Sequence, residues 1–143
     1  MTDHINLAFL RRVLGVIEAA AGSGRDVAID TLHLTQSVRP GVLRRESFDE
    51  IDQRLAAVGA KVLTLNLTRD AIAARAVDGR RDTGFYEYIS RFAGTDAGIV
   101  QHLQREQAAI GERAEHWSAL PHTAQSGELP VTYLANVARS LMT

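Results

Sequence analysis

The feature that most constrains the fold is the apolar run KVLTLNL at residues 61–67, which lies between two helical patterns. Before it, an apolar stripe at helical spacing extends from Phe48 to Val58. After it, Thr68 can cap a helix that runs to about Val77. A short apolar run between helices is typical of a buried strand in an α/β protein, because each helix covers one face of the sheet.

Two shorter segments repeat this arrangement. Residues 27–30 follow a helix expected over about 3–21 and a Gly-Ser-Gly turn at 22–24, and residues 122–125 precede a helix that starts at Pro130. Strands that alternate with helices pair in parallel through right-handed crossovers. We therefore predict an α/β fold with a small parallel sheet flanked by helices. The carboxyl ends of the strands are the expected ligand site.

The rest of the chain is predicted to be helical or irregular. A capping box at 47–50 (SFDE) predicts a helix start, and residues 35–46 are interpreted as a loop. Helical apolar patterns cover about 85–92 and 95–117, which makes the C-terminal half rich in helix. Thr95 can cap the second of these helices. No repeat or linker interrupts the 143 residues, so we expect a single domain over 1–143.

Composition excludes several classes of protein. Sixteen basic against seventeen acidic residues argue against a nucleic-acid or polybasic membrane-surface binder. The absence of cysteine excludes thiolate zinc sites and cysteine nucleophiles. His102 and His116 lie too far apart along one helix to share a metal, so no metal site is predicted. No apolar run approaches the length of a membrane span and no secretory signal is visible, so a cytoplasmic location is expected.

Four segments together resemble thymidylate-kinase-like and deoxynucleoside-kinase-like P-loop kinases. VAIDTLHLT at 27–35 is similar to the V-I-D-R-F-H-L-S segment of that family, and GAKVLTLNL at 59–67 is similar to the strand after its substrate-site helix. Residues 68–81 resemble the stretch that leads into the arginine-bearing lid. HTAQSG at 122–127, followed by a helix starting with proline, resembles the last strand and helix. The order and spacing of these segments over nearly the whole chain carry the resemblance.

The resemblance implies an incomplete version of the three-layer P-loop kinase fold. The chain is similar to the C-terminal two-thirds of a nucleoside or nucleotide monophosphate kinase. The family's first strand, its G-x-x-x-x-G-K-[ST] loop and the helix after it have no counterpart here. Lys61, the only lysine, precedes a strand instead of opening a helix. We therefore expect no self-sufficient catalysis, no certain cofactor, and Mg-ATP only if a partner chain supplies the phosphate loop.

Carried over position by position, the resemblance also implies site residues. Asp30 matches the acid that works near magnesium or the substrate and is the candidate catalytic residue. Thr31 stands where the family has the arginine that holds substrate phosphate, and it cannot supply that charged fork. His33 is a candidate contact to a base or phosphate. The candidates in the lid region are Arg75, Arg80 and Arg81.

Each of these residues also has a structural interpretation. Asp30 can cap a loop, His33 can be a hydrogen-bonded packing residue, and the arginines can form a solvated charged turn. Three hypotheses for the chain follow. It is a kinase-like protein that handles a nucleotide or nucleoside, a non-catalytic interaction or regulatory module, or the truncated product of a larger P-loop kinase.

The missing first strand has a further implication for partners. In the family it lies between the strands that match 27–30 and 62–67. Either those two segments pair directly here, or another segment fills the gap. An open strand edge is normally covered, so we expect a homo-oligomer or a partner chain.

Overall fold

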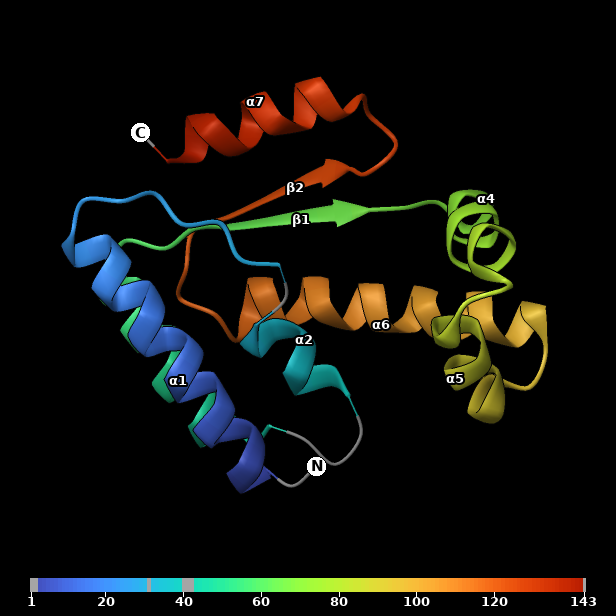
Figure 1. The fold of residues 1–143 in the computed structure, drawn as a ribbon, viewed down its shortest axis with the longest axis horizontal. Coiled ribbons are helices and arrows are strands. Elements are labelled where there is room, and N and C mark those ends of the chain that lie inside the picture. Colours follow the sequence, from blue (N-terminus) through green and yellow to red (C-terminus); the bar gives the residue numbers. More distant parts are fainter. Residues whose placement is uncertain (1–2, 31, 40–42, 143) are drawn as a thin grey trace.

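The computed structural model describes residues 3–30, 32–39 and 43–142, and it has a mixed α/β fold dominated by helices (Figure 1). Its elements in chain order are α1 (Asp3–Gly22), α2 (His33–Val38), α3 (Arg45–Ala57), β1 (Val62–Asn66), α4 (Arg69–Ile72), a π-helical turn (Ala73–Val77), a 3-10 turn (Asp78–Arg80), α5 (Gly84–Ala93), α6 (Asp96–His116), β2 (His122–Ser126) and α7 (Val131–Leu141).

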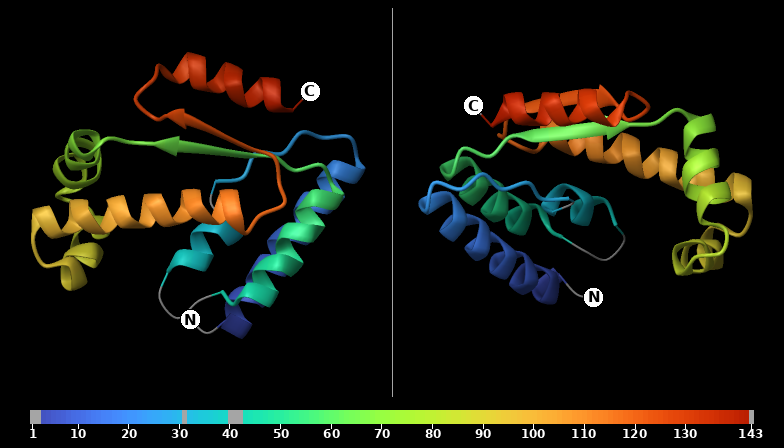
Figure 2. Two further views of the ribbon diagram at one scale, coloured as in Figure 1. Left: turned by 180° about the vertical axis from the view of Figure 1, so that it is seen from behind. Right: turned by 45° about the horizontal axis from the view of Figure 1, so that its top comes forward.

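In the described part of the chain the sheet consists of β1 and β2, which pair in parallel. The register places Val62 opposite His122 and Asn66 opposite Ser126. Figures 1 and 2 show α6 and α7 on opposite sides of this strand pair. The small parallel sheet predicted from the alternation of strands and helices is therefore confirmed.

Apolar side chains form two cores that α6 connects. The first packs α1 against α3 and includes Leu14 and Phe48, both fully buried, together with Ala114 near the end of α6. The second lies around Ile99 near the beginning of α6 and includes Val77. Because one helix contributes to both cores, it fixes the α1–α3 part of the molecule relative to the α4–α5 part.

The prediction of a strand at 27–30 is wrong. This segment follows the turn after α1 and passes the amino end of β1 on its way to α2 in Figures 1 and 2, but it is not a strand. Within the described residues, no backbone hydrogen bond joins it to β1. Val27 and Ile29 are 38% and 48% exposed. An apolar run becomes a strand only when a neighbouring strand supplies ladder hydrogen bonds, and here a cavity separates the two segments.

Two local predictions around residues 33–47 are also wrong. In the loop predicted over 35–46, residues 35–38 belong to the short helix α2 (33–38), which buries His33, Leu34 and Thr35, and residues 45–46 belong to α3. Residues 40–42 of that loop lie outside the described residues. The next helix, α3, begins at Arg45, so Ser47 lies buried in its first turn and does not cap it. In both cases burial against neighbouring helices prevails over the local capping and loop signals.

Two predicted helix caps are confirmed. The Thr68 hydroxyl accepts a hydrogen bond from the Ala71 N–H at 3.2 Å and caps α4, which continues into the π-helical turn. The Thr95 hydroxyl accepts from the Gly98 N–H at 3.0 Å and caps α6. Each satisfies a backbone donor that a helix start leaves without a partner.

Candidate functional site

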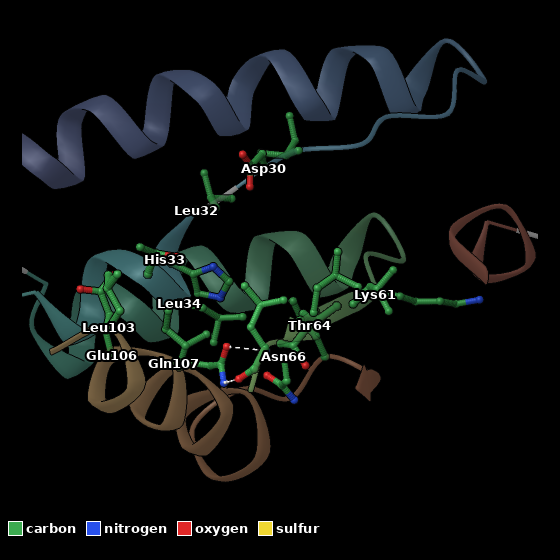
Figure 3. A pocket seen from close by; sticks show the side chains of 18 of the residues that line it. Asp30, Leu32, His33, Leu34, Lys61, Thr64, Asn66, Leu103, Glu106 and Gln107 are labelled. Atoms are coloured by element: carbon green, nitrogen blue, oxygen red, sulfur yellow. Dashed lines mark hydrogen bonds between the residues drawn. The ribbon is translucent and has the colours of Figure 1, made fainter. Parts of the chain in front are cut away.

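A cavity of about 770 Å³ lies between the segment 27–30 and β1, and we call it the β1 cleft. One wall is formed by Val27, Ile29 and Asp30, and the other by residues 61–67. Its floor comes from α2 and α6. Figure 3 shows Asp30 on the upper wall, with His33 and Gln107 across the cavity from it. The volume is within the usual range of ligand sites in proteins.

The cleft brings together most of the residues singled out from the sequence. Asp30, His33, Arg75 and Arg80 all line it, although they come from four different segments of the chain. Arg81 is not among the lining residues. Thr31 lies outside the described residues. The resemblance thus identified side chains that converge on one cavity.

His33 is held by contacts typical of a packing residue. Its Nε2 lies 2.7 Å from the Asp52 carboxylate, and its ring centroid lies 4.6 Å from that of Phe48. Burial lowers the pKa of His33 below its usual value and outweighs the hydrogen bond to Asp52, which raises it. The ring is therefore neutral near pH 7. Its buried Nδ1 has no hydrogen-bond partner among the described residues.

Asp52 organises this region and was missed by the sequence reasoning. Its carboxylate accepts hydrogen bonds from the Ser118 hydroxyl at 2.6 Å and the Ala119 N–H at 2.7 Å, in addition to the contact with His33. It therefore joins α2, α3 and the segment after α6. A signal was present, because Asp52 follows Phe48 by four residues and so falls within the apolar stripe of α3. A carboxylate at a core position needs donors around it.

Two arginines border the cleft near the carboxyl end of β1. Arg75 donates a hydrogen bond to the Gly127 carbonyl at 2.9 Å, and the Arg80 guanidinium lies 5.0 Å from the ring centroid of Phe85. Among the described residues, neither arginine has a carboxylate within ion-pair distance. Both are exposed. Two guanidinium groups without carboxylate partners at the rim of a cavity form a favourable environment for an anion.

Arg81 has a different environment. Its guanidinium donates to Asp96 at 2.9 Å and to Asp78 at 3.0 Å, and these hydrogen bonds raise its pKa above the usual value. Asp96 also accepts from the Tyr86 hydroxyl at 2.7 Å, and that bond, followed by the one from Arg81, lowers the pKa of the Asp96 carboxyl. Arg81 thus links the 3-10 turn to the start of α6, and its charge is neutralised locally.

A second residue missed by the sequence reasoning is Gln107, which lies at the end of β1. Its side-chain oxygen accepts from the Leu67 N–H at 2.9 Å, and its side-chain nitrogen donates to the Leu67 carbonyl at 3.1 Å (Figure 3). Gln107 therefore takes the place of a neighbouring strand at this position. On α6 it lies between Leu103 and Ile110 at helical spacing, which could have indicated a polar side chain facing inward.

The described residues do not fit a triphosphate site. The glycine turn 22–24 follows the C-terminal end of α1, and its Ser23 and Gly24 N–H groups donate to carbonyls of that helix. A phosphate loop instead needs free N–H groups at a helix N-terminus and a lysine. Lys61 extends away from Asp30 and His33 in Figure 3. In the described part of the chain, no group of three or more His, Asp or Glu side chains is placed to hold a metal ion.

Comparison of the chain with protein-family models, with characterised proteins and with solved structures finds no match. Within the described residues, none of the helices combines the length and apolar character needed to cross a lipid bilayer.

Proposed function

We propose that the chain is a kinase-like protein that binds a phosphorylated nucleoside at the β1 cleft and is not catalytically self-sufficient. The observation that carries the proposal is the pair Arg75 and Arg80, which border the cleft without carboxylate partners among the described residues. Guanidinium groups bind phosphate through charge-assisted hydrogen bonds. The kinase-like three-layer fold remains part of this proposal.

Three charged side chains and the apolar walls of the cleft have roles in this proposal. Arg75 and Arg80 hold the phosphate, and the apolar walls contact the base. Asp30 faces the same cavity and accepts a hydrogen bond from a ligand hydroxyl. Because the residues present do not fit a triphosphate, Mg-ATP would bind only with a phosphate loop from a partner chain. We therefore derive no phosphoryl-transfer step for this chain alone.

The test is thermal unfolding of the full chain with a panel of nucleoside monophosphates and with Mg-ATP. A monophosphate at about a hundred times its dissociation constant should stabilise the fold by roughly 2.7 kcal/mol. Mg-ATP should produce no shift. Arg80→Ala should weaken binding of the monophosphate by roughly tenfold or more, since it removes a charged hydrogen bond.

Arg12→Ala is the matched control, because Arg12 is exposed on α1 and does not line the cleft. It should bind the monophosphate like the wild type. Equal loss of binding in both arginine variants would contradict the proposal, and so would the absence of a shift with every monophosphate.

A second candidate function is that of a non-catalytic interaction module. The observation that favours it is the edge of β1 that faces the cleft, which has no strand beside it in the described part of the chain. In this case no nucleotide shifts the unfolding midpoint.

A further inference from the structure

The edge of β1 that faces the cleft carries backbone groups without hydrogen-bond partners. The Val62 N–H donates to the Pro121 carbonyl at 2.8 Å, so Val62 directs its backbone groups toward β2. Successive residues of a strand direct these groups to opposite edges. Leu63 and Leu65 therefore direct their N–H and C=O groups into the cleft. Among the described residues, no backbone group pairs with them there.

The lining of the cleft agrees with this orientation. Every residue from 61 to 67 borders it. Because side chains alternate between the two faces of a strand, a cavity that touches seven consecutive residues lies against the strand's edge and not against one face. The β1 cleft is thus placed where a neighbouring strand would pair with β1.

The wall of the cleft opposite β1 also has backbone groups without ladder partners in the described part of the chain. Residues 26–30 pass the amino end of β1 in Figures 1 and 2 and line the cleft opposite the strand, and within the described chain their backbone makes no hydrogen bond to another backbone group. Val27 and Ile29 are exposed. The cleft is therefore bordered by backbone without ladder partners on two sides.

The chemistry of the lining defines what fits between these walls. The middle of the cleft is apolar, with Val27, Ile29, Leu34 and Ile110, whereas Arg75 and Arg80 lie near the carboxyl end of β1. A small apolar molecule would cover the side chains but leave the Leu63 and Leu65 backbone groups unpaired, which is costly once water is removed. An uncharged apolar strand satisfies both requirements.

We infer that the β1 cleft binds an extended apolar strand of a separate polypeptide, which pairs in parallel with β1 and adds a strand to the sheet. The direction follows from the parallel β1–β2 pair and from its coverage by helices, since parallel sheets are covered on both faces. A second copy of the chain is less suited, because its corresponding apolar segment, Val27–Ile29, already forms one wall. The inference names a partner for the second candidate function, that of an interaction module, and the strand would take the apolar part of the cleft in place of a nucleoside base.

The test uses the full chain with a strand fused after its last residue. Figure 1 shows the end of α7 on the same side of the molecule as the amino end of β1, so a linker of about twelve Gly and Ser residues can lead into the cleft. The probe strand is Val-Ile-Val-Ala-Val, about the usual strand length. The matched control is Val-Pro-Val-Pro-Val, which stays apolar but lacks two N–H donors. Amide hydrogen exchange is measured for Leu63, Thr64 and Leu65.

In the unfused chain, Leu63 and Leu65 should exchange faster than Thr64, whose backbone faces β2. In the Val-Ile-Val-Ala-Val fusion, exchange at Leu63 and Leu65 should slow by about tenfold or more, and in the proline control it should stay near that of the unfused chain. Equal protection in both fusions would overturn the inference, because it would indicate an apolar pocket and not a site for a strand.

Two further outcomes would also overturn it. One is unchanged exchange of Leu63 and Leu65 in the Val-Ile-Val-Ala-Val fusion. The other is an unfused chain that sediments as a dimer with both amides already protected, because a second copy would then cover the edge. The measurement uses no nucleotide, so the inference and the proposed function can fail independently.

Discussion

Asp52 is a buried carboxylate on α3 whose hydrogen bonds join that helix to α2 and to the segment after α6. It has an exposed fraction of 3% and accepts hydrogen bonds from three groups that lie on two other segments of the chain. An amide at this position would direct an N–H group at one of those donors. We expect Asp52→Asn to lower the free energy of unfolding by about 1–3 kcal/mol, measured by urea denaturation.

Asp49→Asn on the same helix is the matched control for this prediction. Asp49 forms an exposed pair with Arg45, and exposed pairs contribute little. Its unfolding midpoint should stay close to that of the wild type. If the two variants lost the same stability, the buried network would not have the role described.

His33 makes stability depend on pH. Burial lowers its pKa in the folded state, so the unfolded chain takes up a proton at a higher pH than the folded chain does. Its contribution is fully present above the ordinary value of 6.5 and is lost as the pH falls from there toward the folded pKa. The free energy of unfolding of the wild type should therefore decrease over this range.

Comparison with His33→Gln isolates this contribution. The variant lacks the titrating ring, so the stability difference between wild type and variant should shrink on acidification from about pH 7.5 to 5.5. Urea unfolding at both pH values measures it. A difference that stayed constant or grew would mean that the folded-state pKa of His33 is not lowered.

At the scale of single elements, α6 contains two glycines with opposite expectations. A Cβ at Gly98 would collide with the Ala93 carbonyl oxygen, whereas a Cβ at Gly111 meets nothing within 4 Å. Gly98→Ala should destabilise the fold by about 1–3 kcal/mol through overpacking against the backbone. Gly111→Ala should stabilise it by roughly 0.5–1 kcal/mol, because alanine loses less backbone entropy in a helix.

Thermal unfolding of both variants measures the difference. Each serves as the control for the other, since the substitution and the helix are the same. A higher midpoint in both variants would show that the turn before α6 can move aside, and a lower midpoint in both would contradict the expectation for Gly111.

The elements that the sequence predicted well are those whose signals are local. The strand at 61–67 lies in one apolar run, and Thr68 and Thr95 cap the residues immediately after them. Residues 27–30 have a similar apolar pattern but no ladder partner, and pairing is a property of the neighbour that the pattern does not contain. The six residues of α2 are too few to show a helical period, so their burial by other elements could not be predicted.

Part of the lining of the candidate site could be predicted from the order of segments along the chain. The resemblance identified Asp30, His33, Arg75 and Arg80 from their order in the chain, and they line one cavity. It also grouped Arg81 with them, because adjacent residues cannot be separated by position alone. Only the three-dimensional arrangement shows that Asp96, fifteen residues further along the chain, binds Arg81.

At the scale of the whole molecule, α7 has the weakest attachment among the longer helices. None of its residues is buried, and Val131 is 81% exposed, whereas α6 buries Ile99, Val100 and Ala114. An isolated helix of this length is marginal in water. The amides of Val131–Leu141 should therefore exchange through a local opening whose free energy lies well below that of global unfolding.

Native-state hydrogen exchange over a series of low urea concentrations measures this opening. The amides of α6 in the same sample are the internal control and should exchange only through much larger unfolding. Protection of α7 equal to that of α6 would contradict a weak attachment.

Gln107 has a consequence for any strand that enters beside β1. Its amide occupies the Leu67 N–H and C=O, so the free part of the edge ends with Leu65. An incoming strand can form backbone hydrogen bonds with Leu63 and Leu65 but not with Leu67. Gln107 therefore limits how far the incoming strand can pair along β1. The alignment matters, because a slip of one residue would exchange the faces of every side chain in that strand. Gln107 would then set the register of the complex without contacting the partner's side chains.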